Sequence, residues 1–167
     1  MSKHFWIFFL LGLGVVGGGL YMLLEGTKSA HLELTGNIIK VRVLPLGPRA
    51  ALVVADFRVT NPSAIPFVVA SVEVLLDPAS GDTRSGSVVS KQQMSVVFQG
   101  QKLIGPKYND ILGMQDRVPP AQTIDRMVAA RFEVPAAVVE SRQALRVRIE
   151  EIDGVSAELR DGPAGAR

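Results

Sequence analysis

The residue types that most often carry chemistry are few in this chain and poorly placed for a shared site. The two histidines, His4 and His31, flank a long apolar run, so we expect them on opposite sides of it. Glu150, Glu151 and Asp153 form a dense acidic group, but neighbouring residues of a strand point to opposite faces. A solvated hairpin edge explains these acids better than a catalytic pair does.

Other catalytic signatures are also missing from the sequence. No serine lies in a Gly-x-Ser-x-Gly motif, and the glycine-rich stretch "GLGVVGGG" lies inside the apolar run, where it cannot hold a phosphate. The chain contains no cysteine, which excludes disulfides, thiolate metal sites and cysteine nucleophiles. We therefore predict a protein that is not an enzyme and has no metal site and no cofactor.

The charge balance argues against nucleic acid as a partner. Basic residues number 18 and acidic residues 16, and no run of lysines or arginines is present. Nucleic-acid-binding proteins usually gather basic residues into a patch or stripe. We therefore expect no nucleic-acid partner.

The N-terminal run predicts a transmembrane helix over residues 5–24. These residues carry no charge, and as a helix they span roughly 30 Å, the thickness of a bilayer's hydrocarbon core. Trp6 and Tyr21 lie where interfacial aromatic residues belong, and Lys3 places positive charge before the span. We expect residues 1–4 in the cytoplasm, a linker at 25–31 and the rest in the periplasm or outside the cell.

A cleaved signal peptide is the alternative for this run. Its apolar region would be shorter and would end in a small-x-small cleavage site. Only Lys28 and Ala30 have that spacing near the end of the run, and lysine suits the site poorly.

Glycines in the span suggest a helix-packing face. Gly14 and Gly18 lie four residues apart, and small residues at this spacing let another membrane helix approach closely. We expect another transmembrane protein as a partner, together with the bilayer itself.

Beyond the span, the predicted domain 32–160 contains several runs in which apolar residues alternate with a period of two. This alternation is typical of antiparallel strands with one face on a core and the other in water, so Asp56, Arg58 and Thr60 are expected on a wet face. We expect six or seven strands in a mostly β, antiparallel β-sandwich, with one or two short helices at 90–98 and 135–142, the first opened by a capping box of Ser90 and Gln93. The tail 161–167 is expected to be disordered. The predicted inward residues are Ile39, Val41 and Val43 after a slip near Gly36–Asn37; Val53, Ala55, Phe57 and Val59; Val68, Ala70, Val72, Val74 and Leu76; Val128, Ala130 and Phe132; and a hairpin of Leu145, Val147 and Ile149 joined by a turn at Asp153–Gly154 to Val155, Ala157 and Leu159.

The stretch "NPSAIP" predicts a stiff corner between two strands. Pro62 and Pro66 lack an N–H and cannot pair within a sheet ladder. Asn61 precedes a proline, which favours extended backbone, and its side-chain amide can bond to backbone groups nearby.

This corner and the strand after it resemble the late embryogenesis abundant group 2 family, which includes the water-stress-and-hypersensitive-response (WHy) domain. The resemblance is best from Leu32 to Asp77, with Ser63 in place of the family's second asparagine. It implies a fibronectin- or immunoglobulin-like sandwich without catalytic residues or cofactor. Its implied roles are stress (desiccation) protection or membrane-associated signalling.

The segment 99–123 is long and irregular, but it is interleaved with apolar residues that argue against disorder. It is either a crossover that covers one end of the sandwich or a loop that binds a protein partner. The candidate contact residues are Lys102, Lys107, Tyr108, Asn109 and Asp110.

The sequence thus predicts a single-pass membrane protein that acts as an accessory or scaffolding subunit of a membrane assembly. Two alternatives stay open. One is a tethered stress-protection module, and the other is a domain that binds lipid or another apolar ligand between its sheets.

Overall fold

The computed structural model describes residues 12–19, 21, 33–100 and 104–161. The predicted N-terminus 1–4, the linker 25–31 and most of the tail 161–167 lie outside the described residues, and so does much of the span 5–24. Residues 12–19 are helical. The further elements are β1 (Thr35–Gly47), β2 (Ala50–Thr60), β3 (Phe67–Asp77), β4 (Arg84–Val88), α2 (Lys91–Gly100), β5 (Asp110–Ile111), β6 (Arg117–Val118), β7 (Thr123–Phe132), α3 (Ala136–Glu140), β8 (Ala144–Glu151) and β9 (Ser156–Arg160).

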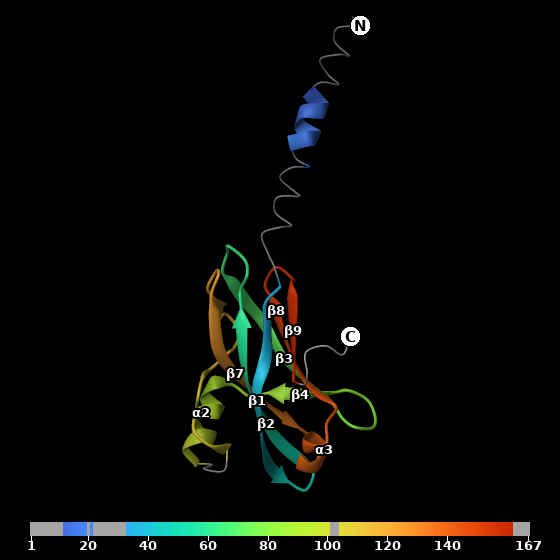
Figure 1. Cartoon of the computed structure of the whole chain (residues 1–167), viewed down its shortest axis with the longest axis vertical. Coiled ribbons are helices and arrows are strands. Elements are labelled where there is room, and N and C mark those ends of the chain that lie inside the picture. The colour runs from blue at the N-terminus through green and yellow to red at the C-terminus, as the bar shows by residue number, and fades with distance from the viewer. Residues whose placement is uncertain (1–11, 20, 22–32, 101–103, 162–167) are drawn as a thin grey trace, which may run out of the picture.

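The strands form one mostly antiparallel sheet that folds over into two layers (Figure 1). One layer contains β1, β2 and β7, and the other contains β3, β8 and β9. β4 joins them, because its start pairs with β3 and its end pairs with β7. The structure confirms the expected mostly β, antiparallel and sandwich-like fold.

The main core lies between the two layers. The inward residues predicted for β2, β7, β8 and β9 all lie in it or pack against it. Phe57, Phe67 and Phe132 are its largest side chains and are at most 2% exposed. The expected hairpin is also present: β8 pairs with β9, and Gly154 has the positive φ of 86° that its turn requires.

Two predicted strand registers were wrong in part, each because of a bulge. The pairing of β3 with β8 shifts between Val69 and Ser71, so Phe67 and Val69 point inward where Val68 and Ala70 were expected. In β1 the slip falls between Ile38 and Lys40 instead of near Gly36–Asn37. Ile39 is therefore 52% exposed.

A second apolar cluster covers the outer face of the β1–β2–β7 layer, where a wet face was expected. α2 contributes Met94 to it, and the segment after α2 contributes Ile104; both are at most 2% exposed. β2 is therefore buried on both faces, and Asp56, expected in water, is only 3% exposed. The wet-face prediction for Asp56 was wrong because α2 covers this face.

The predicted capping box at the start of α2 is confirmed. The Ser90 backbone N–H donates to the Gln93 side-chain oxygen at 3.1 Å, and the Gln93 N–H donates to the Ser90 hydroxyl at 3.3 Å. In the second helix, Pro135 is the N-cap residue instead of the first helical residue that the sequence suggested.

Within the described residues, no helix is both long enough and apolar enough to span a membrane.

Candidate binding groove

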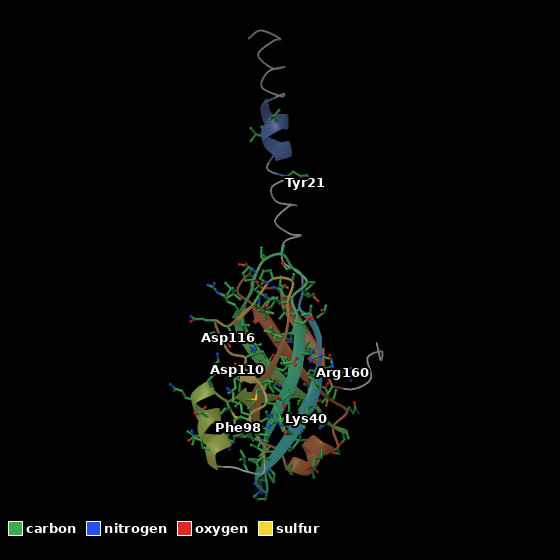
Figure 2. All side chains as sticks on the ribbon, turned by 60° about the vertical axis from the view of Figure 1, so that its left-hand side comes forward. Tyr21, Lys40, Phe98, Asp110, Asp116 and Arg160 are labelled. Carbon is green, nitrogen blue, oxygen red and sulfur yellow. The ribbon has the colours of Figure 1, made fainter. Side chains whose placement is uncertain are left out.

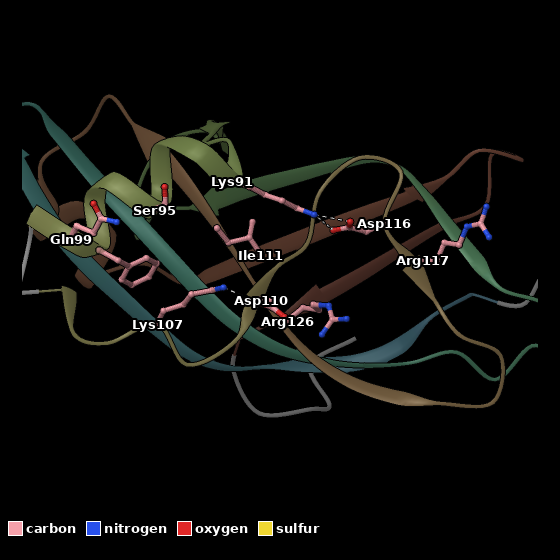
Figure 3. Close-up of a pocket in the computed structure, with 10 residues that line it drawn as sticks. Lys91, Ser95, Gln99, Lys107, Asp110, Ile111, Asp116, Arg117 and Arg126 are labelled. Carbon is pink, nitrogen blue, oxygen red and sulfur yellow. Dashed lines mark hydrogen bonds and ion pairs between the residues drawn. The ribbon is translucent and has the colours of Figure 1, made fainter.

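A groove with a volume of about 540 Å³ lies between α2 and the segment 107–117 (Figure 3). Phe98 of α2 lies on the same side of the domain as Asp110 and Asp116 (Figure 2). The groove is lined by Lys91, Ser95, Phe98, Gln99, Lys107, Asp110, Ile111, Asp116, Arg117 and Arg126.

The groove combines an apolar surface with charged groups. Phe98 and Ile111 are half-buried and pack against the second apolar cluster. Lys91 Nζ lies 2.6 Å from Asp116 Oδ1, and Lys107 Nζ lies 2.6 Å from Asp110 Oδ1. Figure 3 shows Ile111 between these two ion pairs. A ligand side chain that packs on Ile111 would therefore lie between two ion pairs.

The groove carries an excess of positive charge. Of the charged lining residues, four are basic and two are acidic, and the two acids are the partners of Lys91 and Lys107. Arg117 is exposed, and Arg126 donates one hydrogen bond to the Asp125 carbonyl at 3.0 Å, which leaves further donors on its guanidinium. This charge balance favours an anionic ligand.

The surroundings of Asp110 favour its ionised form. The hydrogen bond and charge of Lys107 hold the pKa of Asp110 below its ordinary value, with smaller contributions from Arg126 and Lys91. The lowered pKa keeps the Asp110 carboxylate charged as the partner of Lys107.

A buried polar network holds the segment after α2 against the sheet. Arg42 of β1 donates to Asp56 Oδ2 of β2 through Nε at 3.1 Å and Nη2 at 2.8 Å. Its Nη1 donates to the carbonyls of Ile104 and Pro106 at 2.8 and 3.0 Å. Asn109 Nδ2 completes the network by donating to Asp56 Oδ1 at 3.1 Å.

Aromatic rings cover this network on the outside. The Arg42 guanidinium carbon lies 5.6 Å from the centre of the Phe98 ring and 5.2 Å from that of Tyr108. Lys40 Nζ lies 5.1 Å from the same Tyr108 ring. Because Phe98 also lines the groove, the network and the groove share a wall.

The predicted contact residues of 99–123 fall into different roles. Lys107 and Asp110 line the groove, and Tyr108 is 57% exposed beside it. Asn109 points inward to Asp56, so it supports the loop. Lys102 lies outside the described residues. The segment also covers the fold, because Leu112 and Val118 lie in the main core.

The Asn61 corner is built from side-chain hydrogen bonds. Asn61 is fully buried, donates to the carbonyls of Ile65 and Val118 at 2.8 and 3.1 Å, and accepts from the Ser63 N–H at 2.9 Å. Pro62 and Pro66, which follow Asn61 in the corner, are exposed.

Gly14 and Gly18 lie on the helical residues 12–19 and are exposed. A Cβ built at either position would meet nothing within 4 Å. Both positions are therefore open to a neighbouring helix, and their role stays a prediction.

Sequence reasoning missed the part of the groove that lies outside 99–123. Lys91, Ser95 and Phe98 lie on α2, and Arg126 lies on β7. The helical spacing of residues 91, 95 and 98 was a usable signal, since these positions share one face. The pairing of Lys91 with a residue 25 positions later had no signal in the sequence.

In the part of the chain that the structure describes, no cluster of three or more histidines or acids could hold a metal. No family model matches the chain, and no curated protein sequence matches it. A solved structure with some likeness is the archaellum periplasmic stator protein FlaG from Sulfolobus acidocaldarius, 12% identical, with 76% of this chain and 98% of that chain covered and a TM-score of 0.37. A likeness this loose carries no inference about function.

Proposed function

We propose that this chain is a non-catalytic accessory subunit of a membrane protein assembly. Residues 5–24 tether it to the membrane, and the groove beside α2 binds an acidic segment of a partner protein that carries an aromatic or aliphatic side chain. The observation that carries this proposal is the groove itself, in which four cations and two paired acids surround Phe98 and Ile111.

The chemistry of the groove supports a peptide-like ligand. Carboxylates of a bound segment would pair with Arg117 and Arg126, whose planar guanidinium groups suit bidentate contacts. An apolar side chain of the bound segment, next to these carboxylates, would be removed from water against Phe98 and Ile111. The network of Arg42 and Asp56 fixes one wall, which lowers the entropic cost of binding.

The alternative of an apolar ligand between the sheets has little support. The space between the layers is filled by Phe57, Phe67 and Phe132, while the groove lies outside it. The stress-protection alternative needs no fixed partner, so a selective groove interaction would distinguish the two roles.

The test is binding of a fluorescent acidic peptide of alternating glutamate and phenylalanine to the full chain in detergent. Wild type should bind it more tightly than a peptide with lysine in place of glutamate. Arg117→Glu with Arg126→Glu should abolish the preference, whereas Arg84→Glu, an exposed position outside the groove, should retain it. Equal binding of both peptides by wild type would refute the proposal.

A further inference from the structure

One end of the domain has few charged residues in its loops. Three loops meet there: 61–66, 119–122 and 152–155, which together contain one charged residue, Asp153. β2 ends at Thr60 opposite Thr123, where β7 starts, and the Ile152 N–H bonds to the Val68 carbonyl at the start of β3. Figure 1 shows the tip of the β8–β9 hairpin at the same end as the start of β1.

Apolar side chains are exposed at this end. Ile152 is 63% exposed, and Met114 is 72% exposed on a turn that bonds to Val69 through Gln115 and Asp116. These two side chains therefore flank the first residues of β3. Pro62, Ala64 and Pro66 add exposed apolar atoms in the loop between β2 and β3.

The opposite end of the domain has a different composition. Each of its four connections, at 48–49, 78–83, 133–135 and 141–143, contains a charged residue; these are Arg49, Asp82, Glu133 and Arg142. Leu46 is an exposed apolar residue at that end, with 50% exposure. The two ends thus differ in charge more than in the presence of exposed apolar atoms.

The chain enters the domain at the end formed by loops 61–66, 119–122 and 152–155, next to the exposed Glu33. Thr35 pairs with Thr60, so β1 starts beside the loop 61–66. In the sequence, the ten residues 25–34 lie between the apolar run 5–24 and Thr35, and ten residues span at most about 36 Å. A membrane that holds residues 5–24 therefore lies within reach of this end.

We propose that this end rests on the lipid headgroup layer, with Met114 and Ile152 inserted into it. This inference depends on the membrane tether proposed above. Apolar side chains can enter the interfacial region while the charged groups near them, here Asp116, Arg117 and Asp153, stay at the level of the headgroups. The short linker keeps the effective concentration of the end at the membrane high, so weak contacts suffice.

This docking orients the groove. The groove runs along the side of the domain between α2 and 107–117, so it would face sideways, parallel to the membrane, toward neighbouring membrane proteins.

The absence of cysteine makes a site-specific test possible. Ala64→Cys, labelled with the environment-sensitive fluorophore NBD, reports on the loop 61–66, and Leu46→Cys is the matched probe at the opposite end. The full chain is reconstituted in phosphatidylcholine vesicles with and without lipids that carry a quenching doxyl group near the headgroup. Flotation of the vesicles measures attachment independently.

The probe at residue 64 should show blue-shifted emission and quenching by the doxyl lipids, and the probe at residue 46 should show neither. Adding Met114→Gln with Ile152→Asn should reduce the quenching at residue 64, whereas Val96→Gln on α2 should not. Equal, water-like emission from both probes on a chain that still floats would overturn the docking and leave the tether intact. A chain that fails to float would overturn both, and peptide binding by the groove reports separately on the partner.

Discussion

Arg42 and Asp56 form a buried ion pair on the outer face of the sheet, with side chains only 9% and 4% exposed. The pair joins the two strands β1 and β2, and through Arg42 Nη1 it also holds the carbonyls of Ile104 and Pro106. It therefore links the sheet to the segment that forms the groove. Desolvation offsets much of the Coulomb energy of a buried ion pair. Its contribution to stability therefore depends on the hydrogen bonds that its two side chains make.

Asp56→Asn should destabilise the fold strongly, because it leaves the Arg42 charge buried without a counter-charge. The expected loss in free energy of unfolding is about 3–5 kcal/mol, measured by urea denaturation. The matched control is Asp125→Asn, which breaks the exposed pair with Arg58 between β2 and β7 and should cost much less, because both charges of that pair are in water. Equal losses in the two variants would show that the buried network does not support the fold.

Asn61→Ala should lower the free energy of unfolding by about 1–3 kcal/mol, because it leaves buried backbone groups of the corner without partners. Asn61→Asp keeps the shape and the acceptor for Ser63 but loses the two donated bonds. It should therefore be no more stable than the alanine variant. A melting temperature equal to that of wild type in either variant would exclude a structural role for the asparagine.

Asp77 should contribute to loss of stability in acid. The hydrogen bond from Arg146 holds the pKa of Asp77 below its ordinary value, with help from Thr83. A carboxyl with a lower pKa in the folded state stabilises the fold above its unfolded pKa of about 3.9, and this contribution fades as pH falls through the folded pKa. Wild type should therefore exceed Asp77→Asn in stability at neutral pH, and the difference should shrink in acid. A difference that is constant with pH would contradict the assignment.

Gly14→Leu with Gly18→Leu should reduce association with a partner helix while it preserves membrane insertion. Leucine raises the hydrophobicity of the run, and its bulk prevents close approach of a second helix. The measurement is co-purification of partners from membranes that contain equal amounts of wild type or variant. Unchanged recovery of the same partners would remove these glycines from the interface.

The sequence predicted the strands with strict alternation and failed where a strand departs from it. The β2, β7, β8 and β9 core residues follow a period of two, so their inward faces were readable. The bulge after Val69 reversed the parity of β3, and β4 was missed because "RSGSV" has no alternating apolar residues.

The sequence did indicate that the outer face of β2 around Asp56 would be covered. Leu52 and Val54 share the outward face of β2 with Asp56, and such a face is seldom left in water. What the sequence did not contain was the identity of the covering element. The groove depends on that placement, because α2 meets 107–117 only after both pack on the sheet.

The most direct test of the groove as a partner site is photocrosslinking from α2 in native membranes. A benzophenone amino acid at Ser95 would lie in the groove, whereas the same group at Val96, 68% exposed and one position along the helix, would not line it. The proposal predicts a discrete crosslinked product from residue 95 that is absent from residue 96 and is lost with Arg117→Glu and Arg126→Glu. The same product from both positions, or none from residue 95, would contradict it.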